Sequence, residues 1–331
     1  MSGPQEGTYF INPNHVQVNL PRDYDEEGNV PNNGGKSLAD APPTGVTFLL
    51  ARIRLAHFSR EYTDAIPLDT RKLIGAPYER IVSLDEKLGH FFTELPFFFR
   101  QDEESRQQSR HLEAVYKKVP MMRYCILAAA HTIRCRLHQK FLIRLSSNPR
   151  YEYSRRACLE SARAVIQLYE EPKSDDNSLS ILEMARMAMA VYYTHLALVI
   201  QVMDLCFNKT KSDHDERKRE LFVTLQKLEG ARSISPLLNR SLDSLVEVLR
   251  KHQVQADWTS STGDYQNHGG NPVTLEDGEM DALQNSTGMG EGSIPITPSI
   301  NEFWQNVNQF DMEFDSATWD NFFSNLDSRP I

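Results

Sequence analysis

The sequence lacks paired cysteines. Its four cysteines are scattered singly along the chain, at Cys125, Cys135, Cys158 and Cys206. A structural zinc finger needs closely spaced thiolate ligands, so this chain is not expected to contain one. All four cysteines fall in segments with helical periodicity, which favours reduced, buried thiols in an intracellular protein.

The sequence also shows neither a secretion signal nor a membrane-spanning run. Its N-terminus has no basic stretch followed by an apolar one. The longest apolar stretch runs from Met187 to Met203, is interrupted by His195, and is shorter than the ~20 residues that a spanning helix needs. Because Arg186 and Asp204 flank it, we expect a buried helix at the centre of a bundle and no membrane partner.

Sequence motifs of catalysis are missing as well. No glycine-rich phosphate loop, Gly-x-Ser-x-Gly sequence or paired-histidine metalloprotease motif occurs. His131, Cys135 and His138 lie on one side of a predicted helix, but no fourth zinc ligand is in sight. Arg134 and Arg136 flank this trio and further disfavour a cation there. We therefore expect no enzyme, no metal site and no cofactor in this chain.

Helical periodicity is present over most of the chain, from about residue 44 to about residue 251. The longest apolar stripe covers six turns and consists of Met122, Ile126, Ala129, Ile133, Leu137, Phe141 and Leu145. Capping residues and breakers predict helix starts at Ser154, Ser178, Ser212 and Ser235–Pro236, and helix ends at Pro172, Phe207 and Gly230. The pattern predicts seven or eight helices in an all-α domain, with no sheet.

Composition divides the chain into four parts. Residues 1–44 are rich in Pro, Gly, Asn and Asp and predict an extended arm, of which the alternating fragment His15–Pro21 is expected to lie against the domain. Residues 45–251 form the predicted helical domain. Residues 252–300 lack periodicity and predict a flexible linker, and residues 301–331 form a separate terminal segment.

The C-terminal part is strongly acidic. The last eighty residues hold thirteen Asp and Glu against a single base, Arg329, whereas the other 251 residues hold 32 acids and 35 Lys and Arg. Acidic residues interleaved with bulky apolar ones cannot build a core of their own, but they can bind the groove of a partner. This composition favours an interaction segment.

Two apolar stripes run through this terminal segment. Ser299–Glu302 forms a capping box ahead of the first stripe. The candidate partner-binding residues are Phe303, Trp304, Val307, Phe310, Phe314, Trp319, Phe322, Phe323 and Leu326. Each stripe is too short for a stable free helix, but it can fold with its aromatic face in a partner's groove. The alternative is that the segment packs back onto the helical domain; the long linker and the excess of acids favour a detached segment.

A basic stretch crosses the middle of the helical domain. It comprises Arg134, Arg136, Lys140, Arg144, Arg150, Arg155, Arg156 and Arg163. These residues alternate with the apolar stripe and have acids such as Glu152 and Glu160 nearby, which predicts a solvated, partly salt-bridged face instead of a phosphate-binding one. A second basic cluster, between Lys209 and Arg219, is interrupted by acids and is a weak nuclear import signal.

Five segments follow one another along the chain in a characteristic order: Val16–Asp25, Thr44–Ala56, Leu95–Phe98, Arg134–Arg144 and Asn148–Arg163. In this order they resemble the middle homology region of fungal zinc binuclear-cluster transcription factors. The resemblance covers about residues 11 to 251, and the order of the segments makes it specific. It implies an all-helical regulatory region, which in this family follows an N-terminal six-cysteine zinc cluster that reads DNA and often precedes an acidic activation segment.

The family's zinc cluster has no counterpart in this sequence. The resemblance therefore implies that Met1 is not the natural start, or that the protein acts through partners. In either case zinc and direct DNA contact would belong to a missing N-terminal cluster. The resemblance further implies a nuclear location and control of biosynthetic gene clusters or nutrient use. Both a monomer and a dimer stay open.

We thus expect a transcriptional regulator whose acidic-aromatic tail recruits coactivators. A helical adaptor or scaffold that acts through its folded domain alone is the first alternative. A helical enzyme with a cavity inside the bundle is a more distant one.

Overall fold

The computed structural model describes residues 15, 17–21, 43–65, 78–142, 149–170, 186–209, 212–252 and 254. These residues form eight α-helices and two short 3-10 helices, and no strand occurs among them. The prediction of an all-α protein is confirmed.

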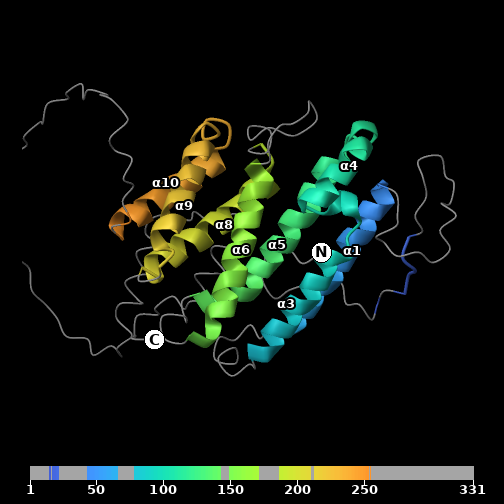
Figure 1. Cartoon of the computed structure of the whole chain (residues 1–331), viewed down its shortest axis with the longest axis horizontal. Helices are drawn as coiled ribbons and strands as arrows, with labels where there is room; N and C mark the ends of the chain where they lie inside the picture. The colour runs from blue at the N-terminus through green and yellow to red at the C-terminus, as the bar shows by residue number, and fades with distance from the viewer. Residues whose placement is uncertain are drawn as a thin grey trace, which may run out of the picture.

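The helices follow one another along the chain in the order of their labels. Their bounds are α1 Gly45–Ala65, α3 Tyr78–Thr93, η3 Phe97–Phe99, α4 Glu103–Val115, α5 Val119–Leu142, η5 Pro149–Tyr151, α6 Glu152–Glu170, α8 Ala188–Phe207, α9 His214–Glu229 and α10 Pro236–Lys251. In Figure 1, α5 and α6 run through the middle, with α1, α3 and α4 on one side and α8, α9 and α10 on the other. The core therefore lies on both faces of the α5–α6 pair.

Helix α8 is the most completely buried helix of the domain. Among the described residues it alone is long and apolar enough to cross a membrane, by length and composition only, and 78% of its most apolar window is buried inside the fold. Residues from Ala190 to Cys206 contact the core on nearly all sides. The prediction of a central buried helix is confirmed. Its predicted start at Ser178 lies outside the described residues, but the backbone is extended at Met187, so α8 begins at Ala188 and does not continue unbroken from further back.

Helix α6 begins earlier than the capping pattern predicts. It starts at Glu152, whose carboxylate suits the positive end of the helix dipole. Ser154, the predicted N-cap, is fully buried inside the helix, and its hydroxyl bonds to His138 of α5 instead of to its own backbone. The Ser154 hydroxyl therefore makes a contact between two helices and does not cap its own helix. For that reason the predicted start at Ser154 is wrong.

The last two helices have the predicted ends. Helix α9 is bounded by Asp213 and Gly230, close to the predicted limits. In α10 the Ser235 hydroxyl accepts the backbone N–H of Leu238 at 3.2 Å, and Pro236 occupies the first turn, as predicted. The apolar face of α10 is buried, as is Val254 just beyond it.

Replacing Ser235 by alanine should lower the free energy of unfolding by about 1 kcal/mol, because it removes the acceptor for one backbone donor at the start of α10. Urea unfolding followed by circular dichroism measures this. Ser233→Ala, at an exposed position two residues earlier, is the matched control and should change stability by less than about 0.5 kcal/mol. Equal effects of the two substitutions would contradict a capping role.

Residues 17–21 have no regular secondary structure. Val18 is 81% exposed and Leu20 is 59% exposed. These two side chains are therefore not part of the core.

Candidate functional site

The nine residues predicted to bind a partner lie outside the described residues, as does the whole segment 301–331. Their role stays a prediction. Among the places in the described residues where polar or charged groups gather are two buried clusters and one open groove.

The basic stretch is mostly engaged in ion pairs. Within the described part, the pairs are Arg134 with Asp85 and Glu160, Arg150 with Glu79, Arg155 with Glu152, Asp204 and Asp213, Arg156 with Glu160, and Arg163 with Glu220. Arg136 donates to the hydroxyl of Tyr192, and its guanidinium lies 5.6 Å from the centre of that ring. The prediction of a salt-bridged face is confirmed, and little of this charge is left for phosphates.

The first buried cluster, here the Asp204 cluster, joins α6, α8 and α9. It comprises Arg155, Asp204, Asn208, Asp213 and Arg217. The Asp204 carboxylate is completely buried and accepts Arg155 Nε at 2.7 Å, Asn208 Nδ2 at 2.9 Å and a further N–H from Arg217. Burial, and then repulsion from Arg155, lower the pKa of Arg217 to about 10. The cluster ties three helices together through one carboxylate.

Asp213 closes the outer side of this cluster. It occupies the N-cap position of α9 without making a capping hydrogen bond. Its half-exposed carboxylate lies 3.1 Å from Arg217 Nη2 and 3.5 Å from Arg155 Nη2. Because Arg217 is 4% exposed, the basic cluster between Lys209 and Arg219 is not presented as a continuous surface, which weakens its reading as an import signal further.

The second buried cluster, here the Asp85 cluster, joins α3, α5 and α6. Asp85 accepts Arg134 Nε at 2.7 Å and Nη2 at 2.8 Å, and the hydroxyl of Tyr153 at 2.5 Å. His138 Nε2 lies 3.3 Å from the same carboxylate. Burial opposes the charge, but the bonds from Arg134 and His138 outweigh it and hold the pKa of Asp85 well below its usual value.

This second cluster includes a serine, a histidine and an aspartate in series. Ser154 Oγ lies 2.8 Å from His138 Nδ1 and 2.8 Å from the hydroxyl of Tyr78. Such a series resembles a hydrolase relay, yet Ser154 and His138 are both fully buried, so a substrate has no access to the hydroxyl. The arrangement positions three helices relative to one another.

The trio of His131, Cys135 and His138, which the sequence places on one side of a helix, is divided among separate contacts. His138 belongs to the Asp85 cluster, the Cys135 thiol faces the carbonyl of Cys158 at 3.7 Å, and His131 lies 3.4 Å from Ser161 Oγ. His131 also stacks on Phe92, with ring centres 4.6 Å apart. Among the described residues no group of three His, Cys, Asp or Glu is placed to hold a metal ion.

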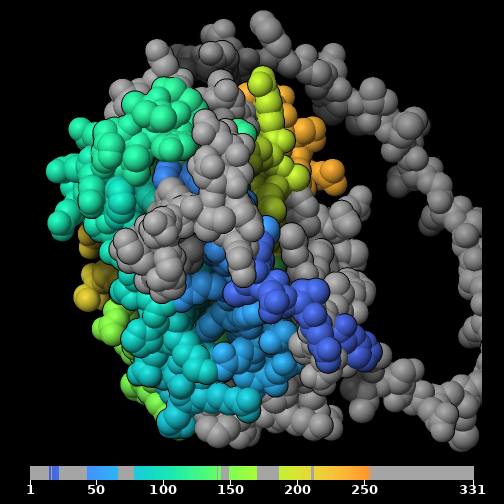
Figure 2. Space-filling model, turned by 90° about the vertical axis from the view of Figure 1, so that its right-hand side faces the viewer, coloured from blue at the N-terminus to red at the C-terminus, as the bar shows by residue number. Residues whose placement is uncertain are grey.

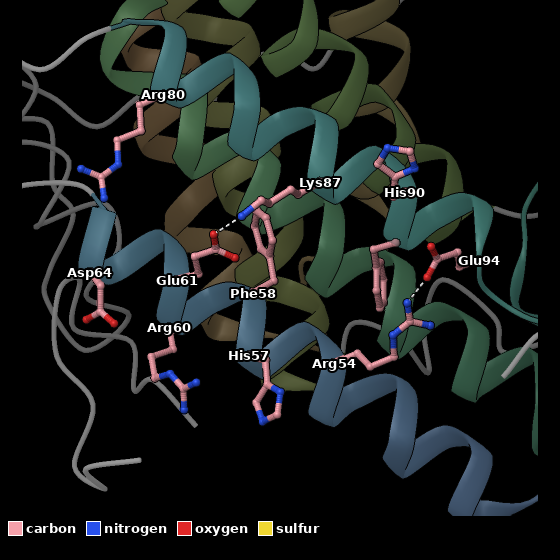
Figure 3. Close-up of a pocket in the computed structure, with 11 residues that line it drawn as sticks. Arg54, His57, Phe58, Arg60, Glu61, Asp64, Arg80, Lys87, His90 and Glu94 are labelled. Carbon is pink, nitrogen blue, oxygen red and sulfur yellow. Dashed lines mark hydrogen bonds and ion pairs between the residues drawn. The ribbon is translucent and has the colours of Figure 1, made fainter. Parts of the chain in front are cut away.

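The open groove runs between α1 and α3, and here we call it the α1–α3 groove. It has a volume of about 910 Å³ and is lined by Arg54, His57, Phe58, Arg60, Glu61, Asp64, Arg80, Lys87, His90, Phe91 and Glu94. Figure 2 shows the two helices next to each other on one face of the molecule, and Figure 3 shows the lining residues. Two ion pairs, Arg54–Glu94 and Lys87–Glu61, cross it. Because the earlier residue of α1 pairs with the later residue of α3, the two helices run antiparallel.

The clusters were not found from the sequence. Asp204 stood out only as the acid that ends an apolar run, and Asp85 did not stand out at all. The one available signal was that a carboxylate on an otherwise apolar helix needs a buried counterion.

The chain is similar in sequence to three fungal proteins that are named as transcription factors. The chain is 36% identical, over 99% of its length, to a probable transcription factor, lepB, of Aspergillus flavus. It is 30% identical over 76% of its length to the agnestins biosynthesis cluster transcription factor AgnL11 of Paecilomyces divaricatus, and 26% identical over 50% of its length to the transcription factor TAS2 of Pyricularia oryzae. These similarities support a fungal transcription factor family.

The chain spans 59% of lepB and 35% of AgnL11. No family model and no solved structure matches it.

Proposed function

We propose that this chain is the regulatory and activating part of a fungal transcriptional regulator of the zinc binuclear-cluster type, acting in the nucleus. The observation that carries the proposal is the similarity to lepB, which extends over 99% of the chain and so includes the acidic end as well as the helical domain. The homologues are named as transcription factors, and nothing in the comparisons suggests an enzyme.

The tail would work by recruitment. Its two aromatic stripes, at Phe303–Phe314 and Trp319–Leu326, alternate with carboxylates, so that a folded stripe has one apolar face and one acidic face. Such a segment gains its helical structure on a partner, where the apolar face is buried and the carboxylates meet a basic rim. Coactivators with apolar grooves are the class of partner that this chemistry fits.

DNA would be reached indirectly. The arginines of the basic stretch are held by ion pairs inside the domain or on its surface, and the acidic end repels phosphate. Contact with DNA, and the zinc that would organise it, are therefore assigned to a cluster outside this sequence or to a partner protein.

Changing seven tail aromatics to alanine should abolish transcriptional activation. The full chain is fused to an unrelated DNA-binding module, and reporter expression is measured with and without the substitution of Phe303, Trp304, Phe310, Phe314, Trp319, Phe322 and Phe323. We expect a loss of about tenfold or more, because the variant keeps the charge but has little apolar surface left to bury. Trp258→Ala with Tyr265→Ala, in the linker, is the matched control.

If the alanine variant is as active as the parent, recruitment through the tail is wrong. The adaptor alternative predicts the opposite behaviour: deletion of residues 252–331 leaves its biological role intact, because the folded domain alone binds the partner.

A biosynthetic gene cluster is the proposed target, since AgnL11 is named for one. Transcript profiles of a strain that lacks this gene test the proposal. Reduced expression of a set of contiguous biosynthetic genes would support it, whereas reduced expression of dispersed nutrient-use genes would replace it.

A further inference from the structure

We propose that the α1–α3 groove binds residues 301–331 of the same chain, so that the acidic-aromatic segment has a docking place on its own domain. The groove combines a recess with several cationic side chains on the described surface. The terminal segment carries six Asp and Glu against Arg329 alone. The proposal concerns a contact within the chain, and its physical test does not depend on the proposed function.

The groove has more positive than negative side chains. Four Lys and Arg line it against three acids, and His57 and His90 add two further nitrogen donors. Two of the cations are paired with acids of the groove itself, as Arg54–Glu94 and Lys87–Glu61. Arg60 and Arg80 make no ion pair within the described part of the chain, and Figure 3 shows them toward the end of the groove where Asp64 also lies. That end therefore has two cations against one carboxylate, and an incoming carboxylate can be bound there.

The two ion pairs that cross the groove are easily exchanged. Their side chains are between 37% and 53% exposed, and pairs as exposed as these contribute about 0–1 kcal/mol each. An incoming carboxylate can therefore take Arg54 or Lys87 from its present partner at little cost. Below them lie Phe58 and Phe91, so that an aromatic side chain entering between the pairs meets apolar surface.

The dimensions of groove and segment agree. From Arg54 to Asp64, α1 supplies one wall of about 15 Å at the helical rise of 1.5 Å per residue. The first stripe, Phe303–Phe314, would cover about 17 Å as a helix by the same rise. Its acids Asp311 and Glu313 would then lie near one end of the groove, where carboxylates can reach the unpaired arginines.

The chain between domain and segment is long enough to allow docking. Treated as a random coil, the stretch from 255 to 300 has an end-to-end distance of about 40 Å, and a tether of this kind gives an effective concentration on the order of 1 mM. A groove that binds the free segment with a Kd of about 0.1 mM would then be occupied roughly nine-tenths of the time by its own tail. Weak contacts are therefore sufficient to keep the tail in the groove for most of the time.

Tryptophan fluorescence of the full chain tests the docking directly. All three tryptophans, Trp258, Trp304 and Trp319, lie beyond the helical domain, and Trp258→Phe leaves the two of the terminal segment as the only reporters. We expect emission at shorter wavelength and slower quenching by acrylamide than in a free peptide of residues 299–331. The charge reversals Arg60→Glu and Arg80→Glu should raise the quenching constant at least twofold, towards that of the peptide.

Arg110→Glu with Arg240→Glu is the matched control. Both positions are exposed, lie on α4 and α10, and change the net charge by the same amount. Unchanged helical circular dichroism in both double variants shows that the domain is folded. If the parent tail is quenched as readily as the free peptide, or if the control and the groove variant release it equally, docking in this groove is wrong.

A second readout separates docking from activation. If the tail recruits coactivators, as proposed above, the groove variant should activate a reporter several-fold more strongly than the parent, because its aromatic residues are free for partners. Slow quenching in the parent that the groove reversals relieve, with no reporter activity in any variant, would support docking and contradict recruitment.

Discussion

Asp204→Ala is expected to lower the free energy of unfolding by about 3–5 kcal/mol, which is a large share of the stability of a domain of this size. The carboxylate of Asp204 is completely buried and faces the guanidinium groups of Arg155 and Arg217. Without it, the two buried guanidinium groups lose their buried counterion and share only the half-exposed carboxylate of Asp213. Chemical denaturation followed by circular dichroism measures the loss.

Asp243→Ala is the matched control for this experiment. Asp243 also pairs with an arginine, Arg232, but its side chain is 62% exposed. Water and ions screen that pair, so its removal should cost less than about 1 kcal/mol. Equal losses for the two aspartates would contradict a structural role of the Asp204 cluster.

A combined variant distinguishes the cost of unpaired charge from the value of the pairing itself. Asp204→Leu together with Arg155→Met and Arg217→Met removes the three buried charges of the Asp204 cluster at once. A buried ion network replaced by apolar residues of similar volume is often close to neutral in stability. We therefore expect the triple variant to be more stable than Asp204→Ala alone. A triple variant that is less stable would mean that packing around the arginine side chains, and not their charge, dominates.

Local patterns in the sequence predicted the helices well, because they arise from local causes. The Ser235–Pro236 start depends on a side chain and a backbone donor three residues apart, and the buried face of α10 follows from helical spacing. The central position of α8 followed from a run of apolar residues with no polar face.

The polar clusters could not be predicted in this way, since their partners are distant in the sequence. Arg134 and Asp85 are 49 residues apart, and so are Arg155 and Asp204. Nothing in the spacing of an arginine along its own helix shows which helix will bring an acid to it. Ser154 illustrates the same limit: its sequence context is that of a cap, and only the packing of α5 against α6 reveals that its hydroxyl meets His138.

Acidification from pH 7 to pH 5 should destabilise the domain substantially. His195, His131 and His138 lie in the core or close to it, and burial lowers the pKa of all three, to about 4 for His195 and about 3 for His131. In the unfolded chain a histidine binds its proton near the ordinary pKa of about 6.5, whereas in the folded domain these imidazoles stay neutral. The unfolded state therefore gains protons first as the pH falls.

The direction in which stability changes with pH follows from this difference in bound protons. When a histidine has a lower pKa in the folded domain than in the unfolded chain, the domain has its full stability above the pKa of the unfolded chain, about 6.5. The stability then decreases as the pH falls from about 6.5 towards the pKa of the folded domain. His195 and His131 should each cost about 2 kcal/mol of stability at pH 5 relative to pH 7. The depressed pKa of the Asp85 carboxyl acts in the same direction, but only near and below the ordinary aspartate pKa of about 3.9, so its effect lies outside the window from pH 7 to pH 5.

His195→Gln tests whether His195 contributes to the acid sensitivity of the domain, through the slope of stability against pH. The Nδ1 atom of His195 lies 2.6 Å from Ser241 Oγ, between α8 and α10, and glutamine can retain a hydrogen bond there without binding a proton. The variant will lose stability at every pH, so the absolute value decides nothing. Between pH 7 and pH 5, however, its stability should fall by about 2 kcal/mol less than that of the parent. His111→Gln, on the exposed surface of α4, removes no buried imidazole and should keep the parental slope. A parental slope in His195→Gln would mean that His195 does not contribute to the acid sensitivity of the domain.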